Sequence, residues 1–293
     1  MEIIALYHYF RGSKVFERAF YTRLLEFVNQ QKLLYEFQFG FREGHSTHLA
    51  IIKLLDEIIT SLDAGEYSAA IFLDFSKAFD RVNHKIMLQK LDHYGVRGVA
   101  NNWVRSYLSE RTQYCTFGDK KSSTTQITCG VPQESILGPL LFLIYINDLG
   151  TIFRNFKTVL FANDSNLVVR GKSLHDVETK INQDTPLLTS WLQTNRLSLN
   201  LSKTHVMIFG KKGTNSDNSF ETKIEGTTIE VVKQTKFLGI ILDNSLSWKQ
   251  HLSYLTSKLA KSIGILTRAR TFLDKINPKT IILFIPIPLS DLL

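Results

Sequence analysis

The stretch that most constrains the fold of this chain is residues 160–169, L-F-A-N-D-S-N-L-V-V. Its two ends are apolar and strand-like, whereas residues 163–166 are of types that favour turns. The pattern predicts a β-hairpin, which requires antiparallel pairing, with the carboxylate of Asp164 at the tip. Because Asn and Asp are also ordinary turn residues, the stretch alone does not decide between a simple turn and part of an active site.

Helices and strands alternate along the rest of the chain. Apolar residues recur at helical spacing in residues 14–34, 49–62, 84–94, 99–108, 135–148, 173–195 and 248–271. Strand-like runs occupy residues 67–75, 112–117, 124–129, 205–209, 223–225, 228–232 and 237–242. This interleaving, with hairpins, predicts an α+β fold with an antiparallel sheet rather than a doubly wound parallel sheet. Pro186 is expected to kink or divide its helix.

Composition limits the class of protein and its compartment. The 293 residues carry a formal charge of +8, which favours a polyanionic partner but is also compatible with a lysine-rich solvated surface. The two cysteines, Cys115 and Cys129, make neither a disulfide framework nor a zinc site. No signal peptide is evident, and the longest apolar run, residues 136–146, is shorter than the roughly 20 residues that span a bilayer. We therefore expect an intracellular protein, in the nucleus or cytoplasm, with no membrane partner.

Two further stretches carry polar residues at positions suited to chemistry. The run I-F-L-D at residues 71–74 ends a buried strand in Asp74, where a carboxylate can hold Mg²⁺ or can simply cap a turn. In C-G-V-P-Q-E-S, residues 129–135, Gly130 and Pro132 force a turn that leaves Gln133 just before an apolar helix. Ser135 is expected to cap that helix, although an ordinary strand-to-helix turn has the same pattern.

Taken in order along the chain, these stretches resemble the reverse transcriptases of non-LTR (LINE-type) retrotransposons. The matching blocks are Q-F-G-F-R-E-G-H-S-T (38–47), F-L-D-F-S-K-A-F-D-R-V-N-H (72–84), G-V-P-Q-E-S-I-L-G-P-L-L-F (130–142), F-A-N-D-S-N-L (161–167), L-S-L-N-L-S-K-T-H-V-M-I-F (197–209) and K-F-L-G-I-I-L-D (236–243). The resemblance runs from about residue 13 to about residue 270. It implies a right-hand polymerase with partial fingers at 1–65, a palm with inserted fingers elements at 66–245, and the start of a truncated thumb at 246–293.

The resemblance also assigns roles to individual residues. Asp74 and Asp164 match the family's metal-binding aspartates, which hold two Mg²⁺ (or Mn²⁺) ions. Lys203 matches the lysine that protonates the departing pyrophosphate, and Phe79 matches the aromatic residue that excludes a ribose 2′-OH. The remaining roles are nucleotide or template contacts by Gln133 and Arg42 and a primer grip at Phe237, Leu238 and Gly239. The implied partners are an RNA template, a DNA primer and dNTPs.

The sequence departs from the family pattern at two central positions. Asn163 stands where the pattern has a metal-binding Asp, so one ligand charge is lost, and Glu134 stands where it has Gly. The ends also differ from the usual fingers and thumb, and no endonuclease domain is seen. These features suggest a truncated and degenerate copy. Three functions remain open: a working polymerase, a catalytically dead relic that still binds nucleic acid, and a co-opted interaction protein.

Overall fold

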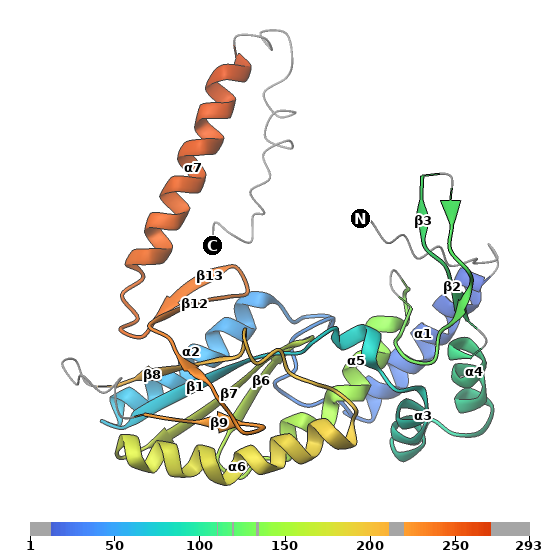
Figure 1. Cartoon of the computed structure of the whole chain (residues 1–293), viewed down its shortest axis with the longest axis horizontal. Coiled ribbons are helices and arrows are strands. Elements are labelled where there is room, and N and C mark those ends of the chain that lie inside the picture. The colour runs from blue at the N-terminus through green and yellow to red at the C-terminus, as the bar shows by residue number, and fades with distance from the viewer. Residues whose placement is uncertain (1–12, 110, 119, 133–134, 211–219, 271–293) are drawn as a thin grey trace.

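A five-stranded sheet forms the centre of the computed structural model, which describes residues 13–109, 111–118, 120–132, 135–210 and 220–270 (Figure 1). The strand order is β11–β8–β1–β7–β6, with β1 (Tyr67–Asp74) in the middle. Its antiparallel neighbours are β7 (Asp164–Gly171) and β8 (His205–Phe209), and β6 (Lys157–Phe161) pairs antiparallel with β7. The edge strand β11 (Glu230–Val231) pairs parallel with β8. The predicted antiparallel α+β sheet is therefore confirmed, with one short parallel pair at its edge.

Alternation along β1 directs its side chains to two different cores. Ala69, Ile71 and Leu73 lie in the larger core, which includes residues of α6 (Leu174–Thr194). Ala70 and Phe72 lie in a smaller core with α2 (Thr47–Asp63) and with the hairpin made by β12 (Gln234–Phe237) and β13 (Ile240–Asp243). By the same alternation, Asp74 lies on the face that carries Ala70 and Phe72.

Among the described residues, six further helices build the other half of the molecule. They are α1 (Ser13–Gln30), the 3-10 helix η1 (Ala78–Arg81), α3 (His84–His93), α4 (Gly98–Leu108), α5 (Gly138–Ile146) and the 3-10 helix η2 (Asn147–Thr151). Every residue of α5 except Pro139 is buried, as its unbroken apolar sequence requires. Glu17 of α1 ties this half together, because one of its carboxylate oxygens accepts from the Tyr107 hydroxyl at 2.8 Å and from Leu137 N–H at 3.0 Å.

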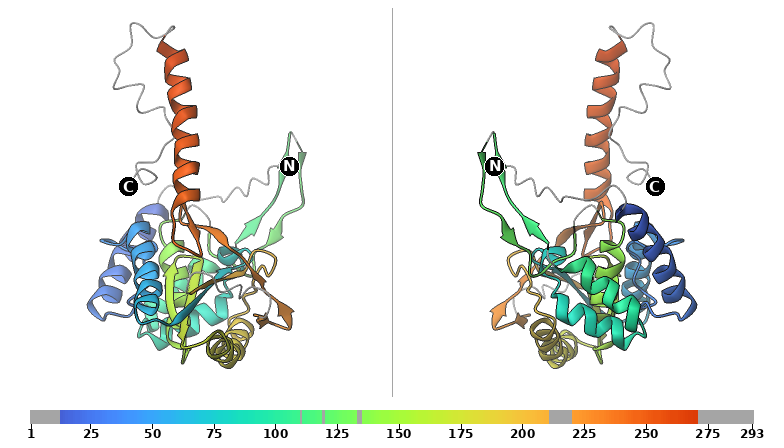
Figure 2. Two further views of the ribbon diagram at one scale, coloured as in Figure 1. Left: turned by 90° about the vertical axis from the view of Figure 1, so that its left-hand side faces the viewer. Right: turned by 90° about the vertical axis from the view of Figure 1, so that its right-hand side faces the viewer.

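Two slender elements rise from the same side of the molecule (Figure 2). One is a ribbon in which β2 (Thr112–Gln113) pairs with β5 (Thr125–Gln126), and β3 (Thr116–Phe117) pairs with β4 (Lys120–Lys121). The other is α7 (Lys249–Arg270), which follows β13. A small hairpin of β9 (Lys223–Ile224) and β10 (Thr227–Thr228) lies against α6.

Several details differ from the sequence-based expectations. Residues 237–242, predicted as one strand, contain the turn of the β12–β13 hairpin, because Leu238 and Gly239 both have positive φ. Pro186 does not divide α6, which is continuous from Leu174 to Thr194. The Ser135 hydroxyl accepts from Gly138 N–H at 2.9 Å, so it closes the turn before α5, which begins three residues later than predicted.

The described part of the chain contains no helix that is long and apolar enough to cross a membrane. The division into parts at residues 65 and 245 stays a prediction.

Candidate active site

Two carboxylates face each other where β1 ends and β7 begins. Asp74 is the last residue of β1, and its register partner across the antiparallel pair is Asp164, the first residue of β7. Side chains of directly opposite residues point to the same face of a sheet, with Cβ atoms about 5 Å apart. The structure therefore brings together the two aspartates that the sequence singled out, from segments 90 residues apart in the sequence.

The environment of this pair disfavours two bare negative charges. Burial raises the pKa of Asp164 above its ordinary value, and the negative charge of Asp74 raises it further. A divalent cation between the two carboxylates would offset both effects, because hard cations prefer carboxylate oxygens. The residues present thus fit a divalent metal ion. Among the residues that the structure describes, no group of three or more His, Cys, Asp and Glu side chains comes together, so the acidic ligand set is a pair.

Ala162 and Asn163 form the loop of the hairpin that joins β6 to β7. The last pair of β6 and β7 is Phe161 with Asp164, which leaves a two-residue loop. Asp164 is consequently in the strand rather than at the tip, where the sequence had suggested it. Ala162 has φ of +54°, a conformation that favours glycine, so surrounding contacts must hold the loop in place. Asn163 is half-buried and immediately precedes Asp164.

Gln38 supplies one of those contacts, a role that the sequence analysis missed. Its side-chain oxygen accepts from Ala162 N–H at 3.1 Å and from Gly40 N–H at 2.9 Å, and the residue is only 1% exposed. Phe39 N–H donates to Leu160 O at 2.7 Å, so the segment runs alongside β6. The available signal was a glutamine within the apolar Q-F-G-F stretch, where a buried amide requires polar partners.

Gly40 completes this support because no larger residue fits beside the loop. A Cβ atom on Gly40 would lie 2.3 Å from the backbone nitrogen of Ala162, far inside contact distance. Arg42 fixes the same segment from the other side, since its Nη1 donates to Tyr35 O at 3.0 Å and to Gln38 O at 2.9 Å. Burial lowers the pKa of the Arg42 guanidinium. Arg42 thus contacts the backbone that supports the hairpin, and its predicted contact with a nucleotide or template stays a prediction.

Phe79 forms an aromatic wall together with two other rings. It stacks on Phe142 with 4.3 Å between ring centroids, and its edge faces Phe41 at 6.3 Å. The G-V-P turn is fixed beside it, because Val131 N–H donates to Phe79 O at 2.9 Å. Gly130 has φ of +90° and no room for a Cβ atom, which would lie 2.9 Å from Asp80 O. The next residues, Gln133 and Glu134, lie outside the described residues, so their predicted roles remain sequence-based.

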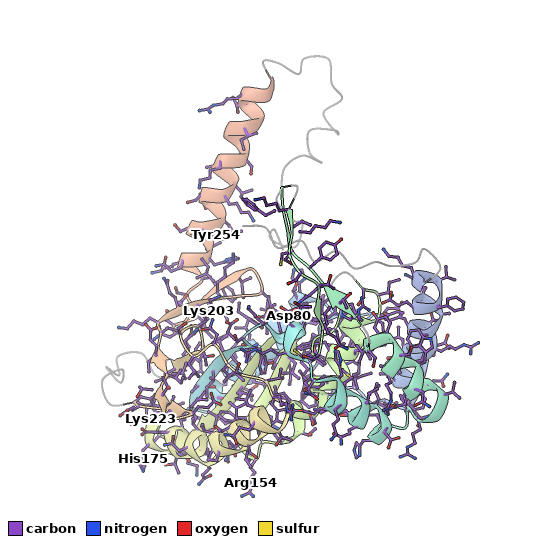
Figure 3. The ribbon with its side chains drawn as sticks, turned by 45° about the vertical axis from the view of Figure 1, so that its right-hand side comes forward. Asp80, Arg154, His175, Lys203, Lys223 and Tyr254 are labelled. Carbon is purple, nitrogen blue, oxygen red and sulfur yellow. The ribbon has the colours of Figure 1, made fainter. Side chains whose placement is uncertain are left out.

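Lys203 is brought close to the end of β1 by its own turn. Asn200 N–H donates to Asp74 O at 2.7 Å, and Lys203 N–H donates to Asn200 O at 3.0 Å. The Thr204 hydroxyl accepts from Asp74 N–H at 3.3 Å, while the Lys203 side chain is exposed. Figure 3 labels Lys203 and Asp80. The fold therefore places the turn that carries Lys203 at the end of β1, and the role of its side chain stays a prediction.

The predicted primer grip is the turn of the β12–β13 hairpin. Phe237 is buried and its ring packs edge-on against Phe72 at 5.9 Å, so it anchors the hairpin to the sheet. Leu238 and Gly239 form the turn and are half-buried. Within the predicted triplet, these two residues are the ones with surface to offer, and their contact with a primer stays a prediction.

Asp74 at the end of β1 faces Asp164 at the start of β7, on a sheet backed by helices, and this fold is that of a right-hand polymerase. The chain belongs to the reverse transcriptase family, because residues 11–242 match the model of the reverse transcriptase (RNA-dependent DNA polymerase). The chain is similar to non-LTR retrotransposon polymerases, so it is a LINE-type reverse transcriptase domain.

The individual relatives set the scale of this likeness. The chain is 30% identical to a probable RNA-directed DNA polymerase from transposon X-element of Drosophila melanogaster, over 92% of this chain and 30% of that protein. It is 27% identical to the RNA-directed DNA polymerase of the mobile element jockey of the same organism, over 82% and 27%. The chain thus spans less than a third of the length of these curated relatives.

Solved structures confirm the fold at low sequence identity. Telomerase from Candida albicans, in complex with a fragment of telomeric RNA, matches with a TM-score of 0.52 at 15% identity, over 86% of this chain and 43% of that one. Telomerase from Candida tropicalis matches with a TM-score of 0.53 at 11% identity, over 82% and 38%.

Proposed function

We propose that this chain performs, in strongly impaired form, the nucleotidyl transfer of an RNA-directed DNA polymerase, extending a DNA primer with dNTPs on an RNA template. The observation that carries the proposal is the pairing of Asp74 with Asp164 across β1 and β7. Phosphoryl transfer requires mainly in-line positioning and neutralisation of developing charge, so converging carboxylates at a strand end suit it.

Divalent metal ions are general in this family, and we propose two Mg²⁺ or Mn²⁺ ions here. Asp74 and Asp164 would hold such ions through their carboxylate oxygens, and bound ions would supply neutralisation of the negative charge that develops in phosphoryl transfer. Asn163 offers one neutral carbonyl oxygen where the family pattern has a third carboxylate, so both metal affinity and rate fall.

The remaining residues of the site position the reactants. The ring of Phe79 forms a wall beside the sugar of the incoming nucleotide and excludes a 2′-hydroxyl. Lys203, whose exposed side chain leaves a turn that is hydrogen-bonded to the end of β1, donates a proton to the departing pyrophosphate. Leu238 and Gly239 contact the primer end, with Phe237 as their buried anchor.

Primer extension on an RNA template, with Mg²⁺ or with Mn²⁺, tests the proposal. Four proteins are compared: the unmodified chain, Asn163→Asp, Glu134→Gly and the double variant. We expect traces of product or none from the unmodified chain and a gain of orders of magnitude from the double variant. Adding Asp74→Asn to the double variant should abolish synthesis, which assigns the product to this site.

Each other result has a defined meaning. Full synthesis by the unmodified chain would show that two carboxylates suffice and would overturn the impairment. Silence from every variant, with nucleic-acid binding retained, would support the alternative function. That alternative is a binding protein without synthesis, and the charge of +8 and Asn163 favour it.

A further inference from the structure

The ribbon formed by β2 to β5 has no core of its own. We call residues 111–127 the hairpin arm. None of its described residues is buried, and its strands pair only with each other. A two-stranded hairpin is marginal in water, and this one is exposed on both faces. Packing therefore does not explain the residue types that the arm carries.

The arm carries an aromatic ring together with a lysine on each face. Phe117 is 78% exposed, and its register partner on the opposite strand is Lys120. Lys121 Nζ lies 5.1 Å from the ring centroid of Tyr114, on the face to which Thr116 and Lys121 also point. At the base, the Arg111 guanidinium lies 5.5 Å from the Tyr107 ring centroid. These pairs repeat along the arm from base to tip.

This combination matches the chemistry of single-stranded nucleic acid. Unpaired bases stack on exposed aromatic rings while nearby cations contact the phosphates. Residues 111–127 contain three basic residues and one acidic residue in the sequence, Asp119. The described residues of the arm form no contiguous apolar patch of the kind that marks many protein-interaction sites. Phe117 is the one large hydrophobic residue among those described in the arm that is strongly exposed.

Along the sequence, the arm is followed by the turn that contacts the aromatic wall around Phe79. After β5 the chain reaches Gly130, whose carbonyl oxygen lies 2.8 Å from His84 Nε2. Val131 follows, and its N–H donates a hydrogen bond to Phe79 O. The arm and α7 rise from the same side of the molecule, with the sheet between them (Figures 1 and 2). The chain that leaves the arm thus reaches the wall at Phe79 within a few residues.

We propose that the hairpin arm binds the unpaired template strand ahead of the primer end, with bases on Phe117 and Tyr114 and phosphates at Lys120 and Lys121. The inference rests on the proposed function, because a template must be present. It does not require synthesis, so it holds equally for a chain that binds without catalysis.

Equilibrium binding of the full chain tests the inference. The probes are a blunt primer–template duplex and the same duplex with an unpaired 5′ extension of the template RNA, each carrying a fluorophore for anisotropy. The variants are Phe117→Ala and the double variant Lys120→Ala, Lys121→Ala. The matched control is Lys157→Ala, Lys172→Ala, which removes two exposed lysines at the opposite end of the sheet from Asp74.

We expect the unmodified chain to bind the extended probe more tightly than the blunt one. Phe117→Ala should weaken binding of the extended probe about tenfold, the value of one stacked base. The double lysine variant should reduce the slope of log affinity against log salt by about 1.4, for two phosphates of a single strand. Both should leave binding of the blunt probe, and thermal stability, unchanged.

The failures are separable. No binding of either probe by the unmodified chain would overturn the proposed function itself. Binding that arm variants and control variants weaken equally, or not at all, would overturn only the inference. An equal loss on both probes would show that the arm contacts the duplex, and this too would overturn the single-strand assignment.

Discussion

At the residue scale, the proposed impairment of activity depends mainly on one side chain, that of Asn163. Asn163 is half-buried and immediately precedes Asp164, and in the proposed metal site its amide would provide one neutral oxygen. The loss of one of three negative charges should lower the affinity of such a site for divalent cations. It should disturb the fold far less, because Asn and Asp occupy nearly the same volume. We therefore expect Asn163 to leave the fold intact and to lower the proposed polymerase activity.

The raised pKa of Asp164 gives a stability prediction. Because folding raises this pKa, by burial and by the charge of Asp74, the folded state binds its proton more tightly than the unfolded state. Ionised Asp164 thus destabilises the metal-free protein as the pH rises from the unfolded pKa through the folded one. Asp164→Asn removes this cost, and we expect its Tm to exceed that of the parent at neutral pH by a few degrees.

The measurement is thermal melting across the acidic range, in chelator and then with Mn²⁺. In chelator the advantage of Asp164→Asn should shrink as the pH falls through the folded pKa and should be gone below the unfolded pKa. Added Mn²⁺ should stabilise the parent more than the variant, because the cation needs the carboxylate. An Asp164→Asn protein less stable than the parent in chelator at neutral pH would contradict the charge crowding described above.

At the level of elements, the support of the hairpin by the segment around Gln38 is the sharpest mechanical feature. We predict that Gly40→Ala displaces the Ala162–Asn163 loop, because the new Cβ atom would lie 2.3 Å from a backbone nitrogen that cannot rotate away. The cost of such overpacking is about 1–3 kcal/mol. The measurements are the free energy of unfolding and, in the Asn163→Asp, Glu134→Gly background, the rate of primer extension.

Gly264→Ala is the matched control for that substitution. Gly264 lies within α7, and a Cβ atom there would meet nothing within 4 Å. Alanine should stabilise the helix by up to about 1 kcal/mol. If Gly40→Ala behaved like Gly264→Ala in both measurements, the segment around Gln38 would not support the hairpin.

The elements also show what sequence can and cannot predict. Helix caps have local signals: Asn83 stands just before a predicted helix and Ser173 at the start of another, and both side chains accept a backbone N–H of the first turn. The opposition of Asp74 and Asp164 required a family resemblance, since register between distant strands has no local signal. Gln38 was missed for the same reason: its partner Ala162 lies 124 residues away.

At the scale of the whole molecule, the direction of α7 depends on one carboxylate. Asp243, at the end of β13, accepts from the N–H and hydroxyl groups of Ser245 and Ser247 and from Trp248 N–H. Burial alone would raise the pKa of Asp243, but these hydrogen bonds outweigh it and lower the pKa. This turn therefore fixes how α7 leaves the β12–β13 hairpin.

We predict that Asp243→Ala frees α7 from the sheet while the five-stranded palm stays folded. In this variant, five donors in the turn between the hairpin and α7 lose their acceptor. The hydrogen bond from Ile241 N–H to His251 Nδ1, at 3.3 Å, remains between β13 and α7. Hydrogen exchange of α7 amides should accelerate at least tenfold, and binding of a primer–template duplex should weaken. Because the pKa of Asp243 is depressed, the parent should show the same acceleration as the pH falls through that pKa.

Ser173→Ala distinguishes this effect from the loss of any helix cap. The Ser173 hydroxyl accepts from Asp176 N–H at 3.1 Å at the start of α6, in the palm. Its loss should cost about 1 kcal/mol and speed exchange in the first turn of α6 without changing α7. Unchanged exchange of α7 in Asp243→Ala would mean that the helix is held by its packing on β13. The direction of α7 would then be set by this packing and not by the hydrogen bonds of Asp243.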